Sequence, residues 1–136
     1  MKNYLDERLK FFIKSILNIN IESDILFIKD SNFKYIYANE IFCNLFNINA
    51  ADIIGKGDEV FIFDKKVLKK CFESDKATYE KDFIIHEENV FNQRYEVLKL
   101  KINLGERGEG ILCFAKLGGS SKLWNFFYKF LLLVNI

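Results

Sequence analysis

Residues 25–46 read ILFIKDSNFKYIYANEIFCNLF, and this stretch decides the fold. Two short runs of apolar, aromatic and β-branched residues, at 25–28 and 34–38, are separated by the polar sequence DSNF, which is typical of a hairpin turn. Asn39 stands just before residues 40–46, and its side chain can accept a hydrogen bond from a free amide of a helical first turn. The stretch therefore predicts two paired strands followed by an Asn-capped helix.

Two further helices are expected in the middle of the chain. A short one should follow Asn49 and end at Gly55, a residue that readily adopts the left-handed conformation of a C-terminal cap. Another should begin after Asp64, because the apolar residues between 67 and 72 recur at the spacing of one helical face.

The second half of the chain changes to a strand pattern. Residues 77–85 alternate and predict a third strand, with a turn at 86–89. Residues 91–104 predict a fourth strand, and the change of its apolar phase near Val97 indicates a β-bulge. The nearly continuous apolar run at 111–117 is typical of a central strand that is covered on both faces.

The composition favours one globular domain with a well-filled core. The chain has 136 residues, of which half are hydrophobic and 16% are aromatic. Its 20 basic residues are balanced by 19 acidic ones, so nucleic acid is not expected as a partner. Three widely spaced cysteines without a Cys-x-x-Cys pair predict reduced thiols, and the charged N-terminus lacks a signal peptide, so we expect a cytoplasmic protein.

The two ends of the chain predict helices outside the main domain. Residues 1–22 have the apolar spacing of an amphipathic helix, which could pack on its own domain or against another chain. Residues 118–136 begin as a Gly/Ser linker and continue as an apolar tail, which is shorter than the ~20 residues of a membrane span and contains Lys129. The tail could pack on the core, bind a partner or a membrane surface through residues 122–136, or be the abnormal end of a longer reading frame.

The order of the predicted elements and two motifs resemble a PAS domain over residues 23–117. The motifs are Tyr37-Ala-Asn39 and Ile54-Gly-Lys56, followed by Asp58 where the family often has an acidic residue. The resemblance implies an α+β fold, with a five-stranded antiparallel sheet, short helices on one face and a ligand cavity between them. Two departures concern the first hairpin, where Phe33 replaces the usual glycine, and the end at Leu117, where LGGSS replaces the Asp-Ile-Thr type sequence that transmits signals.

The sequence requires no cofactor. Photoactive flavin members of the family share an Asn-Cys-Arg-Phe run, which neither Cys43 nor Cys71 matches. Haem members usually supply an axial histidine from the helix before the third strand, whereas His86 is predicted beyond that helix, so haem is disfavoured. A non-covalent flavin or another small organic molecule needs no short motif and is compatible with the sequence. No metal site is predicted, and no catalytic motif is present, so we do not expect an enzyme.

The resemblance implies a signal-sensing or protein-interaction module of a signal-transduction system. Such a module would form a homodimer or bind another signalling protein, and would hold a small molecule or a partner in its cavity. The alternatives are a ligand-free dimerisation or interaction domain and, less favoured, a flavin- or haem-binding redox sensor.

The side chains expected to line the ligand cavity would otherwise be ordinary core. They are Phe27, Tyr37, Phe42, Phe46, Phe63, Leu68, Phe72, Phe83, Arg94, Tyr95, Leu98 and Cys113. Arg94 and Tyr95 are the polar candidates for an anionic ligand.

Overall fold

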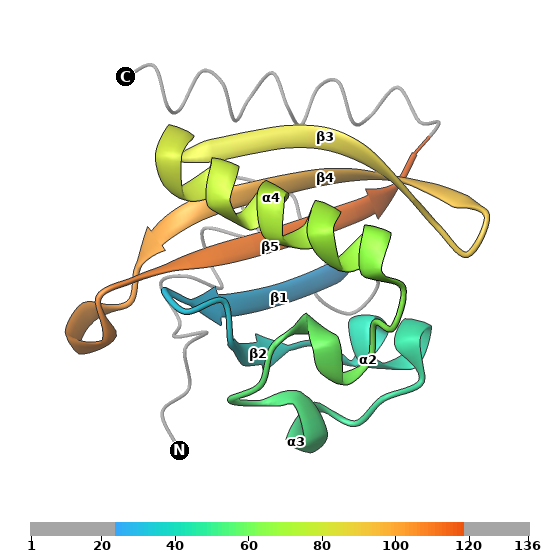
Figure 1. Ribbon diagram of the computed structural model, residues 1–136, viewed down its shortest axis with the longest axis horizontal. Coiled ribbons are helices and arrows are strands. Elements are labelled where there is room, and N and C mark those ends of the chain that lie inside the picture. Colours follow the sequence, from blue (N-terminus) through green and yellow to red (C-terminus); the bar gives the residue numbers. More distant parts are fainter. Residues whose placement is uncertain (1–23, 119–136) are drawn as a thin grey trace.

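The computed structural model describes residues 24–118, so the predictions for 1–22 and for the tail after residue 118 lie outside the described residues. One antiparallel sheet of five strands has helices on one face, and α4 crosses in front of it (Figure 1). The elements in chain order are β1 (Ile25–Asp30), β2 (Tyr35–Ala38), α2 (Glu40–Phe46), α3 (Ala50–Ile53), η2 (Asp58–Val60), α4 (Lys65–Lys81), β3 (Phe83–Val90), β4 (Gln93–Asn103), η3 (Gly105–Arg107) and β5 (Glu109–Leu117). The expected α+β architecture is confirmed.

The strand order in the sheet is β2-β1-β5-β4-β3, which places β5 in the centre, as predicted. Both faces of β5 are buried because the sheet has a core on each side. One core, facing the helices, includes Phe27, Phe42 and Val97. The other lies on the opposite face and includes Leu98 and Phe114.

The first hairpin and the Asn-capped helix are confirmed. Asp30 Oδ1 accepts hydrogen bonds from the amides of Asn32 and Lys34, at 2.9 and 3.0 Å, and so organises the turn. Phe33 takes the left-handed position, with φ of 61°, where a side chain is strained. Its ring packs edge-on against Phe72, with the centroids 5.8 Å apart, and this contact helps to hold the turn on α4.

Asn39 joins three segments of the chain. Its side-chain Oδ1 accepts from the amide of Phe42 at 3.1 Å, which caps α2, and from the amide of Leu26 in β1 at 3.2 Å. Its Nδ2 donates to the carbonyl of Asp24 at 2.6 Å. The side chain is buried, so these bonds fix the start of α2 against the sheet.

The strand predicted at 77–85 is wrong in its first half, because α4 continues to Lys81. Thr78 and Asp75 are buried residues of α4, and they extend its inner face at helical spacing. Because both side chains are polar, the helical period of the buried face cannot be recognised from apolar residues alone. The turn predicted at 86–89 is also wrong, since β3 continues through it, and Phe91 and Asn92 make the two-residue turn with positive φ values.

The bulge predicted in β4 is absent. β4 pairs without a register break with both β3 and β5, so its side chains alternate throughout. Tyr95, Val97 and Lys99 face the helices, whereas Leu98 and Leu100 face the other core. The apolar pattern of the sequence shifts after Val97 because the next residue on the helix-facing side is Lys99, a buried lysine in place of an apolar residue.

Replacing Asn39 by Ala should lower the free energy of unfolding by about 2 to 3 kcal/mol, because the helix cap is lost and the Leu26 amide loses its buried acceptor. Urea unfolding followed by circular dichroism measures the change. Asn44→Ala is the matched control, since Asn44 is exposed within the same helix, and it should change the stability by less than about 0.5 kcal/mol. Equal effects of the two substitutions would contradict the assigned role of Asn39.

Candidate functional site

A cavity of about 320 Å³ lies between the helices and the helix-facing side of the sheet. Its walls come from all five strands, from α2, η2 and α4, and from the segment that connects η2 to α4. Alternate residues of β1, β4 and β5 point toward it, as in Tyr95, Val97 and Lys99 of β4. Phe63 and Phe91 also line it and are exposed, so the cavity is open to solvent.

One half of the cavity is aromatic. Phe42 of α2 lies in the middle of this cluster, with its ring centroid 4.9 Å from those of Phe27 and Phe46. Tyr35 and Phe61 follow at 5.7 Å. The tilted and edge-on arrangements are those that aromatic pairs prefer, so these rings form a well-packed apolar wall.

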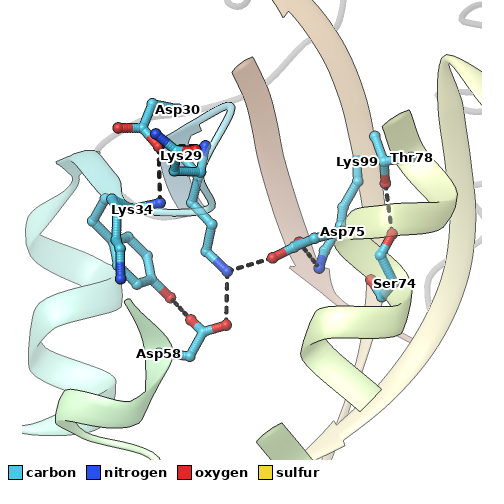
Figure 2. Close-up of polar contacts among 10 residues, drawn as sticks. Lys29, Asp30, Lys34, Asp58, Ser74, Asp75, Thr78 and Lys99 are labelled. Atoms are coloured by element: carbon cyan, nitrogen blue, oxygen red, sulfur yellow. Dashed lines mark hydrogen bonds and ion pairs between the residues drawn. The ribbon is translucent and has the colours of Figure 1, made fainter. Parts of the chain in front are cut away.

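The other half contains a chain of buried charges (Figure 2). Asp75 of α4 accepts from two lysines, with Oδ2 2.7 Å from Lys29 Nζ and Oδ1 2.7 Å from Lys99 Nζ. Lys29 also donates to Asp58 Oδ2 at 2.8 Å, and the Tyr35 hydroxyl donates to Asp58 Oδ1. We call Lys29, Asp58, Asp75 and Lys99 the charge cluster.

The charge cluster is neutral as a whole and almost completely buried. Asp75 is 1% exposed, and Lys29 and Lys99 are 1% and 3% exposed. Charges that have left water need partners of opposite sign with good geometry, and each lysine here has at least one carboxylate. Because the four residues come from β1, η2, α4 and β4, their ion pairs hold α4 and η2 at a fixed distance from the sheet.

Burial and the charge of Asp58 raise the pKa of Tyr35 well above its ordinary value, so its hydroxyl stays a donor. Burial alone would lower the pKa of Lys99, but Cys113 and Asp75 outweigh burial and raise it, so Lys99 remains charged. Burial raises the pKa of Cys71 to about 11 and that of Cys113 to about 12. Both thiols in the cavity wall are therefore neutral near pH 7.

Six of the twelve residues predicted to line a ligand site lie in the cavity wall. They are Phe27, Phe42, Phe46, Phe63, Tyr95 and Cys113. Their contact with a ligand stays a prediction.

The other six predicted residues lie away from the cavity. Tyr37, Phe83 and Leu98 pack in the core on the opposite face of the sheet. Leu98 was assigned to the wrong face because of the expected bulge. Leu68 and Phe72 line a separate hollow beside the β1–β2 turn. Arg94 is half exposed, with its guanidinium 3.9 Å from Glu87.

Sequence reasoning missed the charge cluster, apart from noting Asp58. A signal was present: Asp75 follows Cys71 by four residues, so a carboxylate stands on the apolar face of α4. Lys29 and Lys99 likewise interrupt apolar strands at positions that face the helices. Opposite charges at buried positions of neighbouring elements indicate a buried ion pair.

Within residues 24–118, no group of three or more His, Cys, Asp or Glu side chains could hold a metal ion. None of the helices in the described part of the chain is both long and apolar enough to cross a membrane.

No family model matches the sequence, and no curated protein matches it. Solved structures do match. A domain of an HTR-like protein from Haloarcula marismortui has a TM-score of 0.61 and 11% identity, with 71% of this chain and 98% of that chain covered. The PAS domain of BvgS from Bordetella pertussis has a TM-score of 0.57 and 12% identity, with 92% and 97% covered.

The PAS domain of the histidine kinase ThkA has a TM-score of 0.55 and 8% identity, with 68% of this chain and 98% of that chain covered. Identities this low establish similarity of fold alone. Together with the observed strand order and helices, these matches show that the described part of the chain has the PAS fold.

Replacing Asp75 by Asn should lower the free energy of unfolding by about 3 to 5 kcal/mol, because two buried lysines lose their shared counter-charge. The matched control is Glu73→Gln in the same helix, where an exposed carboxylate lies 3.9 Å from Lys69. That substitution should cost less than about 0.5 kcal/mol. Chemical denaturation of both variants measures the difference, and an Asp75→Asn effect below about 1 kcal/mol would show that the cluster is not essential to the fold.

Proposed function

We propose that this chain is a sensory module that binds a small organic molecule in the cavity between its helices and its sheet. The observation that carries this proposal is the cavity itself, which combines an aromatic wall with a few buried polar groups. Small-molecule sites are typically mostly apolar clefts of about 300 to 1,000 Å³ with a small number of polar groups that orient the ligand. At about 320 Å³, this cavity lies at the lower end of that range.

A role in signalling is supported by the fold. The PAS domain of ThkA belongs to a histidine kinase, and its fold is shared by the described part of this chain. We propose that occupation of the cavity changes how the module contacts a signalling partner, either a second copy of itself or another protein.

The size of the cavity favours a compound with one or two rings over a flavin. Haem is not favoured by the position of His86, because this residue belongs to β3, has its Nε2 3.9 Å from Glu88, and does not line the cavity. Polar groups in the wall, such as Lys99 and Tyr95, can hydrogen-bond to an organic ligand, so the proposed site does not require a cofactor.

We propose binding without catalysis. A reactive cysteine needs its thiolate form, and the raised pKa values of Cys71 and Cys113 keep both thiols protonated near neutral pH. Lys99 is charged and bound to Asp75, so its amine is not available as a nucleophile. The groups around the cavity therefore support recognition rather than covalent chemistry. The free thiols of Cys43, Cys71 and Cys113 also suit the reducing cytoplasm, which we propose as the location.

A ligand-free interaction domain is the second candidate. It is favoured by the exposed apolar side chains at the cavity opening, since Phe63 is 82% exposed and Phe91 is 65% exposed. Both side chains line the cavity, and exposed apolar groups around one cleft can mark a surface that contacts another protein. The two candidates differ in whether a small molecule occupies the cavity.

Replacing Ala115 by Leu should abolish ligand binding or weaken it at least about tenfold, because Ala115 is buried in the cavity wall and a larger side chain would fill ligand space. Ala51→Leu makes the same change at an exposed position of α3 and should leave binding unchanged. Native mass spectrometry of protein purified from its own host detects a retained ligand, and an NMR fragment screen detects weaker ones. The absence of any small molecule by both methods, together with a defined oligomer, would favour the interaction domain instead.

A further inference from the structure

Lys99 has hydrogen-bonding capacity that the protein does not use. Its ammonium group carries three N–H donors, and one of them donates to Asp75 Oδ1 at 2.7 Å. No other acceptor among residues 24–118 lies within hydrogen-bonding distance of Lys99 Nζ. Because the residue is 3% exposed, its remaining donors have little access to bulk water.

Lys29 provides the contrast within the same cluster. Its ammonium group donates to both Asp58 and Asp75, and it also lies 5.0 Å from the ring centroid of Tyr35. Two of its three N–H groups have carboxylate acceptors, and its charge also lies over an aromatic ring. The two lysines therefore differ in degree, because Lys99 has two N–H donors without a protein acceptor and Lys29 has one.

The free donors of Lys99 adjoin the cavity. Lys99 follows Tyr95 and Val97 along the helix-facing side of β4, and all three side chains line the cavity. Cys113, its neighbour on β5, also lines the cavity and is a neutral thiol. A molecule in the cavity is thus placed to accept a hydrogen bond from Lys99, which would remove the cost of leaving buried donors unsatisfied.

The charges around this position favour a neutral acceptor over an anion. Lys29 and Lys99 are already balanced by Asp58 and Asp75, so no surplus positive charge is available for a carboxylate. Glu88 is another acidic residue in the cavity wall, and it would repel an anion. Arg94, the cation that the sequence indicated for an anionic ligand, lies outside the wall.

We propose that the ligand is a small, uncharged aromatic molecule whose carbonyl oxygen or ring nitrogen accepts a hydrogen bond from Lys99. Its ring would pack against the aromatic wall formed by Phe42, Phe46 and Phe61. This inference rests on the proposed binding function, and it adds the chemical class of the ligand and the residue that selects it.

The test uses three probes of similar size: toluene, benzamide and benzoate. NMR titration of the full chain gives a dissociation constant for each. Benzamide should bind at least about tenfold more tightly than toluene, because a hydrogen bond to a charged donor is added, and more tightly than benzoate. The amide signals of Val97 and Cys113, and the ammonium signal of Lys99, should shift with benzamide.

The matched variant is the double substitution Lys99→Met with Asp75→Asn, which removes one charge of each sign and keeps the Lys29–Asp58 pair. In this variant, the affinity for benzamide should no longer exceed the affinity for toluene. If the variant does not fold, the Lys99 ammonium signal of the unaltered protein provides the same test, since it should shift with benzamide and not with toluene.

Three results would overturn the proposal. Tightest binding of benzoate would show that the site selects an anion. Equal affinities for toluene and benzamide, with no effect of the double substitution, would show that Lys99 does not select the ligand, while the proposed binding function would stand. Failure of all three probes to bind at millimolar concentration, together with no ligand in the purified protein, would instead contradict the binding function itself.

Discussion

The carboxylate of Asp75, buried between the ammonium groups of Lys29 and Lys99, is the interaction on which the rest of the structure depends. It joins the longest helix to two separate strands, and Asp58 extends the same chain of ion pairs to η2. A buried charge without its partner is strongly unfavourable, so these residues must stay together for the chain to fold. This polar connection borders the cavity and links α4 and η2 to the sheet.

The same arrangement connects the interior of the cavity to the helix layer. Lys99 faces the cavity and shares Asp75 with Lys29, which in turn binds Asp58 (Figure 2). A molecule that accepts a hydrogen bond from Lys99 would therefore contact a chain of charges that reaches α4 and η2. In the proposed sensory function, these ion pairs connect an occupied cavity with α4, which packs on β3, β4 and β5.

The parts of the fold that follow local rules could be predicted from the sequence. The hairpin, the Asn39 cap and the central position of β5 depend on turn chemistry, capping and apolar runs, and all three are present. Two of the errors share a cause, which is that polar residues occupy buried positions. Asp75 and Thr78 are polar residues on the buried face of α4, so the apolar pattern does not show its last turns. Lys99 is a polar residue on the helix-facing side of β4, so the apolar pattern does not show its regular alternation. The candidate site is half correct because the hydrophobic pattern identifies buried apolar side chains but not which face of the sheet they occupy, as for Tyr37 and Phe83, and does not identify a buried polar cluster.

A crystal structure of the protein purified from its own host tests the central claim most directly. The account predicts density for a small molecule in the cavity, with an acceptor atom within hydrogen-bonding distance of Lys99 Nζ and with Asp75 bridging both lysines. A cavity filled by the chain's own side chains, with Lys99 turned toward solvent and separated from Asp75, would contradict it.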